Sequence, residues 1–113
     1  MTIDYRSVSL WFDQLAEPLT PRAPLSGDLE VDVAIVGAGF TGLWTAYYLQ
    51  AADPSLRIAL LEKHIAGFGA SGRNGGWCSA LFPVSAGTLA AETTSAAATA
   101  QYAAMRGAVD EVE

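Results

Sequence analysis

The sequence contains one cysteine, Cys78, and one histidine, His64, and this scarcity excludes several kinds of site. A single cysteine cannot form a disulfide within the chain, which is typical of a reducing compartment, so we expect a cytoplasmic protein. One cysteine and one histidine cannot supply the four ligands of a structural zinc site, so we expect no metal centre. We expect a small buried thiol at Cys78 and a surface imidazole at His64, and we assign no catalytic residue.

Basic residues are also few, with 6 Lys and Arg against 12 Asp and Glu and a net charge of −6. No basic cluster is available to neutralise phosphates, so we expect neither nucleic acid nor an anionic membrane surface as a partner. The apolar stretches are too short to span a bilayer. The acidic N-terminus lacks an apolar core and does not resemble a secretory signal. With 113 residues, 51% of them hydrophobic, the chain is expected to hold one modest globular core.

A dinucleotide-binding βαβ unit is indicated by a β-branched run at residues 31–36, which predicts a buried parallel strand. Gly37, Gly39 and Gly42 then form G-x-G-x-x-G at the start of a helix. The first glycine of this motif permits a tight turn, the second lets the backbone approach a pyrophosphate, and the third lets the helix pack against the sheet. The phosphates would lie at the N-terminus of a helix starting near Phe40, where N–H groups and the helix dipole favour an anion.

An acid follows the second predicted strand, as this kind of unit requires. Asp53 and Pro54 end the helix, residues 57–61 predict a strand, and Glu62 lies about 20 residues beyond the last glycine. A carboxylate there would accept hydrogen bonds from ribose and repel a 2′-phosphate, which favours FAD or NAD over NADP. Alternatively, the glycines only punctuate an ordinary connection and Glu62 is a solvated acid. The expected apolar face of the helix comprises Leu43, Ala46, Tyr47, Leu49 and Gln50.

A second glycine-rich segment, GFGASGRNGGW at residues 67–77, contains five glycines. Glycine loses more conformational freedom on folding than any other residue, so a dense run after a nucleotide-binding strand favours close approach of backbone to a ligand. Ser71, Arg73 and Asn74 would offer a hydroxyl, a cation and an amide to that ligand. The alternative is a flexible surface loop with an incidental arginine.

The strings GAGFTG, LLEK and IAGFGASGRNGG together resemble the N-terminal end of FAD-dependent oxidoreductases of the D-amino-acid oxidase superfamily. The resemblance covers about residues 31–85, is strongest to the γ-glutamylputrescine oxidoreductase group, and favours FAD over NAD. It implies that the first glycine motif holds the FAD pyrophosphate, that the acid holds the adenosine ribose, and that the second motif lines the pyrophosphate and the isoalloxazine edge. The expected cofactor-binding residues are Gly37, Ala38, Gly39, Phe40, Thr41, Gly42, Glu62, Lys63, Gly69, Ala70, Ser71, Arg73, Asn74, Gly75 and Gly76.

The reaction implied by the resemblance is oxidation of the C–N bond of a small-molecule amine or amino acid. Hydride passes to flavin N5, the imine product hydrolyses, and oxygen commonly reoxidises the flavin. The flavin performs the chemistry while the protein places it, so Arg73 is a candidate for stabilising negative charge on the pyrophosphate or the reduced flavin. Two alternatives stay open: a non-catalytic nucleotide-binding or interaction module, and part of an NAD-dependent dehydrogenase.

We divide the chain into an N-terminal extension at 1–30, the FAD-binding unit and its glycine-rich loop at 31–85, and the start of a long alanine-rich helix at 86–113. The fold class is α/β, a Rossmann-like βαβ unit within an incomplete domain. The extension is expected to be mostly irregular, and its aromatic patch at residues 11–12 either docks on a larger body or is ordinary surface. Because the superfamily is several times longer, we expect an N-terminal fragment that ends mid-helix and is inactive alone. The predicted helical stripe comprises Leu89, Tyr102, Met105, Val109 and Val112.

Overall fold

The computed structural model describes residues 3–112 of the chain. It divides between Gly75 and Gly76 into two compact units. The first unit contains the 3-10 helix η1 (Tyr5–Val8), the helix α1 (Leu10–Gln14), the strands β1 (Val33–Val36) and β2 (Ile58–Leu61), the helix α2 (Phe40–Ala52) and the 3-10 helix η2 (Ala70–Gly72). The second unit contains the helices α3 (Ala86–Glu92) and α4 (Ser95–Asp110).

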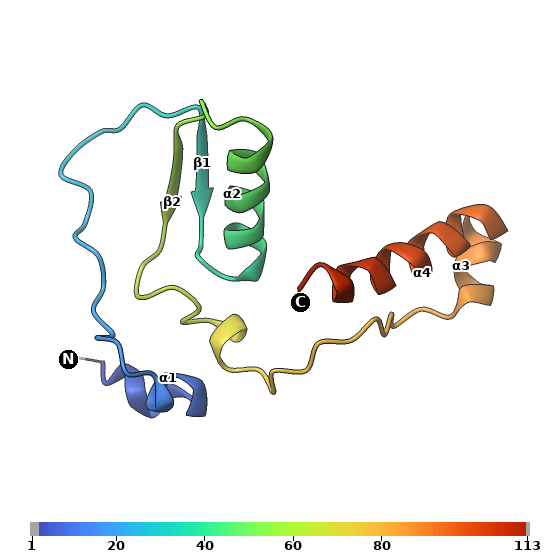
Figure 1. The fold of residues 1–113 in the computed structure, drawn as a ribbon, viewed down its shortest axis with the longest axis horizontal. Helices are drawn as coiled ribbons and strands as arrows, with labels where there is room; N and C mark the ends of the chain where they lie inside the picture. Colours follow the sequence, from blue (N-terminus) through green and yellow to red (C-terminus); the bar gives the residue numbers. More distant parts are fainter. Residues whose placement is uncertain (1–2, 113) are drawn as a thin grey trace. The chain divides into compact units, whose positions relative to one another are not determined.

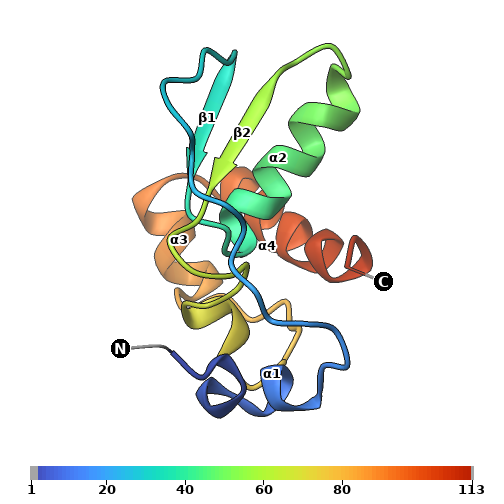
Figure 2. The ribbon, with the colours of Figure 1, turned by 90° about the vertical axis from the view of Figure 1, so that its left-hand side faces the viewer.

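The centre of the first unit is a two-stranded parallel sheet in which β1 pairs with β2. The register places Val33 opposite Ile58 and Val36 opposite Leu61. Helix α2 connects the two strands and lies beside them (Figures 1 and 2). The predicted strand, helix and strand are therefore confirmed, with each end within two residues of its expected position, and the helix starts at Phe40 as predicted. The prediction that the first strand is buried is wrong, because the residues of β1 alternate between half-buried and exposed and Val36 is 86% exposed.

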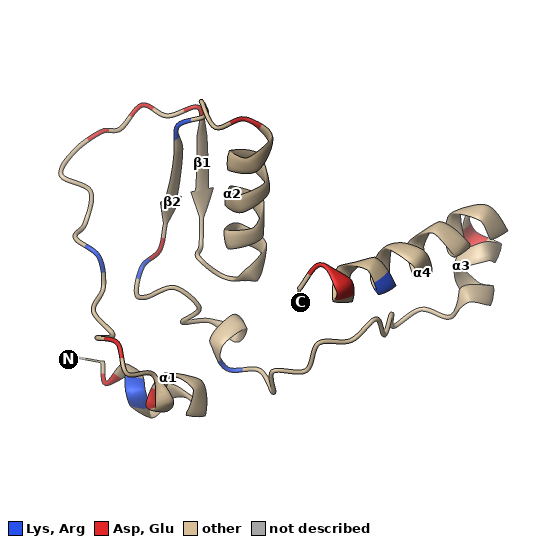
Figure 3. Ribbon diagram, in the orientation of Figure 1, with Lys and Arg blue, Asp and Glu red and all other residues tan. Residues whose placement is uncertain are grey.

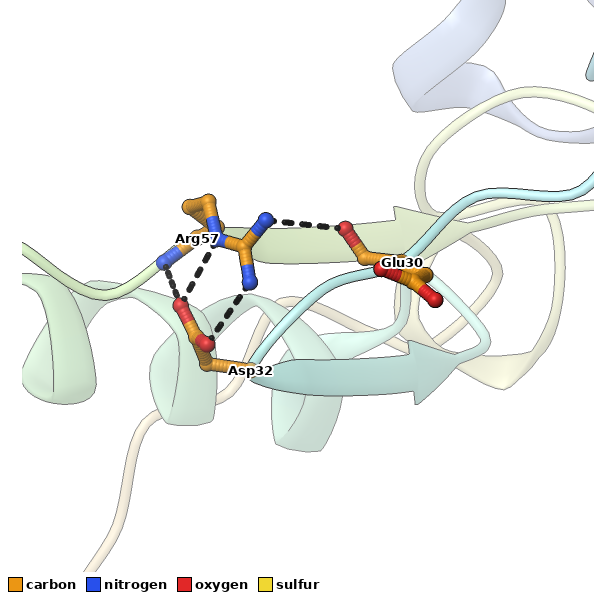
Figure 4. Close-up of polar contacts among 3 residues, drawn as sticks. All are labelled: Glu30, Asp32 and Arg57. Carbon is orange, nitrogen blue, oxygen red and sulfur yellow. Dashed lines mark hydrogen bonds and ion pairs between the residues drawn. The ribbon is translucent and has the colours of Figure 1, made fainter.

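An exposed ion pair joins the chain just before the two strands begin (Figure 4). The Arg57 guanidinium donates to both Asp32 carboxylate oxygens at 3.0 and 3.1 Å, and the backbone N–H of Arg57 donates to the same carboxylate at 2.9 Å. The hydrogen bonds from Arg57 lower the pKa of Asp32 from 3.8 to about 2. The pair thus fastens the end of the sheet opposite to the glycine turn.

The face that helix α2 presents to the sheet matches the predicted face only in part. Leu43, Tyr47 and Gln50, all assigned to the inner face, are exposed. Gly42 is buried, and Ala46 and Leu49, which lie on the same face of the helix as Gly42, are half-buried. The helix contains no charged residue, so its pattern lacks the polar contrast that would indicate the inner face, and the close approach at Gly42 sets the orientation instead.

The N-terminal segment contains helical turns that the sequence did not predict. Residues 15–32 have no helix or strand, as expected, but η1 and α1 form between residues 5 and 14. Side chains cap both elements, because Asp4 accepts from the N–H of Arg6 at 3.1 Å and Ser9 accepts from the N–H of Phe12 at 3.3 Å.

The second unit corrects the prediction of one long helix. The chain breaks after α3, and Thr94 starts α4 by accepting a hydrogen bond from the N–H of Ala97 at 3.1 Å. Helix α3 packs against α4, with Ala98 buried and the Tyr102 hydroxyl donating to the carbonyl of Val84 at 2.7 Å. Cys78 is exposed rather than buried, because it lies in a segment without helix or strand.

Candidate cofactor site

The first glycine turn brings the end of β1 against the start of α2. Gly37 has φ +100°, which an L side chain rarely adopts, and its N–H donates to the carbonyl of Leu61 at 2.7 Å. A Cβ at Gly42 would overlap the carbonyl oxygen of Gly37 and would lie 3.3 Å from Cγ2 of Ile35. The two glycines therefore have the predicted roles of a tight turn and of close packing between helix and strand.

Glu62 holds the glycine turn through its carboxylate. One oxygen accepts from the N–H of Ala38 and the other from the N–H of His64, each at 3.0 Å. These bonds lower the pKa of Glu62, so its charged form is stabilised. The side chain is exposed, and a carboxylate has about four acceptor positions, so it can still accept hydrogen bonds from ribose hydroxyls.

The second glycine motif lies against the first. The N–H of Gly67 donates to the carbonyl of Ala38 at 2.8 Å, and the Ser71 hydroxyl accepts from the N–H of Phe40 at 2.9 Å. A Cβ at Gly39 would lie 2.9 Å from the Ser71 Oγ atom. The Ser71 hydroxyl oxygen thus already accepts a hydrogen bond from the first N–H of α2. The sequence predicted both motifs, but not this contact between them.

Two polar residues of the second motif are held by the loop itself. The Arg73 Nε donates to the carbonyl of Phe68 at 2.8 Å, and the guanidinium lies 4.5 Å from the centre of the Phe68 ring. The Asn74 amide donates to the carbonyls of Ala70 and Ser71 at 3.2 and 2.7 Å. Arg73 and Asn74 remain exposed, so their positions are set while their surfaces stay accessible.

The other predicted site residues contribute less distinctive geometry. Thr41, Lys63, Gly69 and Gly75 are exposed in the first unit. Gly76 belongs to the second unit and has φ +69°.

Aromatic residues that the sequence does not place near His64 surround it in the structure. The centre of its ring lies 4.2 Å from the centre of the Phe68 ring, and its Nδ1 lies 3.5 Å from the Tyr5 hydroxyl oxygen. His64 is consequently half-buried rather than a surface imidazole. No sequence signal joins these residues, because Tyr5 is distant from the other two along the chain.

Residues 3–112 contain no group of three or more His, Cys, Asp or Glu side chains that could bind a metal ion. Within the same residues, no helix has the length and apolar character needed to cross a membrane. Lys and Arg are spread along the ribbon and do not gather in one stretch (Figure 3).

The donors at the site suit a dinucleotide that carries a pyrophosphate. They combine the N-terminal turn of α2, a hydroxyl and an accessible cation, and the Glu62 carboxylate stands beside them for a ribose. The fold is a mixed helix and strand arrangement with a parallel two-stranded sheet, consistent with part of an FAD-binding domain.

Residues 32–112 match the family described as FAD dependent oxidoreductase (DAO), and the chain belongs to this family. The chain is 40% identical over 68 residues to γ-glutamylputrescine oxidoreductase of Escherichia coli (strain K12), which is 60% of this chain and 16% of that protein. It is 45% identical over 53 residues to the protein named probable oxidoreductase OrdL of Haemophilus influenzae, covering 47% of this chain and 12% of the relative.

A third relative has a different name. The chain is 35% identical over 80 residues to thiamine thiazole synthase of Aspergillus fumigatus, covering 69% of this chain and 24% of that protein. The chain therefore spans between 12% and 24% of the length of these three relatives. No solved structure matches the chain.

Proposed function

We propose that this chain is the N-terminal FAD-binding part of an oxidoreductase that oxidises the C–N bond of an amine or amino acid. The observation that carries the proposal is the meeting of the two glycine motifs at the start of α2, through the Ser71 hydroxyl and the carbonyl of Ala38. The FAD dependence of the family and the similarity to γ-glutamylputrescine oxidoreductase support it. In this proposal β1, α2 and β2 are the first Rossmann-like unit of a larger domain.

In this proposal, different residues of the site would bind different parts of FAD. The first turn of α2 and the Ser71 hydroxyl would hold the pyrophosphate, because N–H groups and the helix dipole favour an anion there. Glu62 would accept the ribose hydroxyls. Arg73 and Asn74 would lie toward the pyrophosphate or the isoalloxazine edge, with Arg73 offsetting negative charge. The remaining predicted residues of the first unit would contribute backbone and space: Gly37, Ala38, Gly39, Thr41, Gly42, Lys63, Gly69, Ala70 and Gly75.

When bound, FAD would supply an acceptor for a hydride from the substrate carbon beside nitrogen, so that water could hydrolyse the resulting imine and oxygen could take up the electrons. The residues of this chain act before that step, by binding and orienting the cofactor. Glu62 stays ionised near neutral pH, since its lowered pKa reflects two backbone hydrogen bonds.

Anaerobic mixing of the purified flavoprotein with amines and amino acids tests the proposed reaction. Bleaching of the flavin bands by one class, with formation of the matching carbonyl product, is the expected result. Bound flavin that no amine or amino acid bleaches would contradict the proposed substrate class. The similarity to thiamine thiazole synthase makes this test necessary, since the matched segment also occurs in a protein with a different name.

The role of Arg73 has its own test. Arg73→Ala should weaken FAD binding or slow flavin reduction, because it removes the accessible cation of the second motif. Arg22→Ala is the matched control, since it removes an exposed cation that lies outside both glycine motifs. Unchanged FAD affinity and unchanged reduction in Arg73→Ala would refute the charge-stabilising role.

A further inference from the structure

The N-terminal clamp, which we define as residues 3–17, contacts the second glycine motif at three separate points. We propose that this clamp positions the cofactor-binding loop 67–75, with Phe12 and Trp11 as its positioning residues. The role of residues 67–75 in cofactor binding rests on the proposed function. The contacts between the clamp and this loop lie within the first unit and involve no cofactor.

The first contact is a fit between a ring and a glycine. Phe12 is among the few buried residues, at 6% exposure. A Cβ added to Gly72 would lie only 2.7 Å from Cζ of Phe12, and one added to Gly67 would lie 3.8 Å from the same atom. The ring therefore fills a notch that exists because Gly72 has no side chain. Because the Phe12 ring is buried here, this is the main apolar contact between the clamp and the loop.

The second and third contacts involve the polar end of the loop. The indole Nε1 of Trp11 donates to the backbone carbonyl of Asn74 at 2.8 Å. The Tyr5 ring meets the ring of Phe68 edge-on, with centroids 5.8 Å apart and an interplanar angle of 90°. Phe68 in turn lies under the Arg73 guanidinium. The clamp thus contacts the backbone of one proposed cofactor residue and the aromatic support of another.

The clamp is itself fixed by Arg6. The guanidinium donates to the carbonyls of Phe12, Asp13 and Glu17 at 3.2 Å, and to that of Leu15. These carbonyls lie at the end of α1 and just after it, where helix carbonyls have no partner within the helix. Terminal segments are poorly ordered unless something ties them down, so these bonds keep residues 11 and 12 in place against the loop.

Hydrogen exchange without FAD tests the clamp directly. Phe12→Leu keeps an apolar side chain but vacates the notch at Gly72, and Trp11→Phe keeps the ring but removes the donor. Leu10→Ala is the control, because Leu10 lies in the same helix and is 60% exposed. Exchange of amides in residues 67–75 should rise about 3- to 10-fold in the first two variants, with β1, β2 and α2 unchanged. The control should resemble the unmodified protein.

FAD affinity provides the second readout. Trp11→Phe should raise the Kd for FAD by about 3- to 10-fold and alter the visible circular dichroism of the bound flavin, while Leu10→Ala changes neither. Unchanged exchange in the loop, or equal increases throughout the chain, would overturn the clamp. Failure of the unmodified protein to bind FAD would overturn the proposed function instead. The exchange experiment would still test the clamp, because it is done without FAD.

Discussion

Replacing Gly42 by alanine tests the close packing that brings α2 to the glycine turn. In an unconstrained helix this change stabilises by about 1 kcal/mol, because glycine is a poor helix former. Here the new Cβ would overlap the carbonyl oxygen of Gly37 and press on Ile35 at 3.3 Å. A backbone oxygen cannot move without opening the turn, and overpacking typically costs about 1–3 kcal/mol. At the upper end of that range, the net destabilisation is about 2 kcal/mol.

Gly107 offers a matched control within the same chain. It lies inside α4, and a Cβ there would meet nothing within 4 Å, so Gly107→Ala should stabilise by about 1 kcal/mol. A change of 1 kcal/mol shifts the Tm of a small domain by roughly 4–8 °C. Thermal unfolding followed by far-ultraviolet circular dichroism should therefore show a lower Tm for Gly42→Ala and a higher one for Gly107→Ala. A raised Tm in both variants would refute the close packing at Gly42.

Three further substitutions test other parts of the site and of the fold. Gly37→Ala should destabilise the fold by roughly 1–3 kcal/mol through backbone strain at φ +100°. The added Cβ would meet nothing within 4 Å, so strain alone would cause the effect, and an unchanged Tm would contradict this conformation. Glu62→Gln should weaken FAD binding about 10-fold, as it replaces a charged acceptor of two backbone N–H groups, and an unchanged Kd in a fluorescence titration would count against the ribose role. The Asp32 pKa falls from 3.8 to about 2 on folding, so the pair with Arg57 stabilises above about pH 4 and its contribution is lost as the pH falls through 2. Asp32→Asn should abolish that part of the acid dependence measured by urea unfolding, and an identical acid profile would exclude the pair as its source.

The part of the fold that the sequence predicted depends on short-range patterns. The β-branched run, the three glycines and Pro54 fix β1, α2 and β2 through neighbouring residues alone, and the structure confirms these elements. The break between α3 and α4 was missed although Thr94 is a residue type that favours helix starts. The surrounding alanines favour helix so strongly that they obscured this signal.

The contacts that build the site were beyond sequence reasoning. Ser71 reaches the N–H of Phe40, and Phe12 reaches Gly72, across separations for which no periodicity exists. The sequence is compatible with both docking and ordinary surface for the aromatic patch at residues 11–12, and the structure separates its two members, with Phe12 buried and Trp11 exposed. Tertiary packing decides such cases, because local sequence carries no information on which distant backbone offers a notch.

The visible absorption spectrum of the protein purified from cells tests directly whether this chain holds FAD. We expect the two absorption bands of oxidised flavin, and release of FAD rather than a mononucleotide when the protein is denatured. Gly42→Ala, purified in parallel, should carry less flavin. A protein that shows no flavin bands, even after incubation with FAD, would rule out FAD binding by this chain.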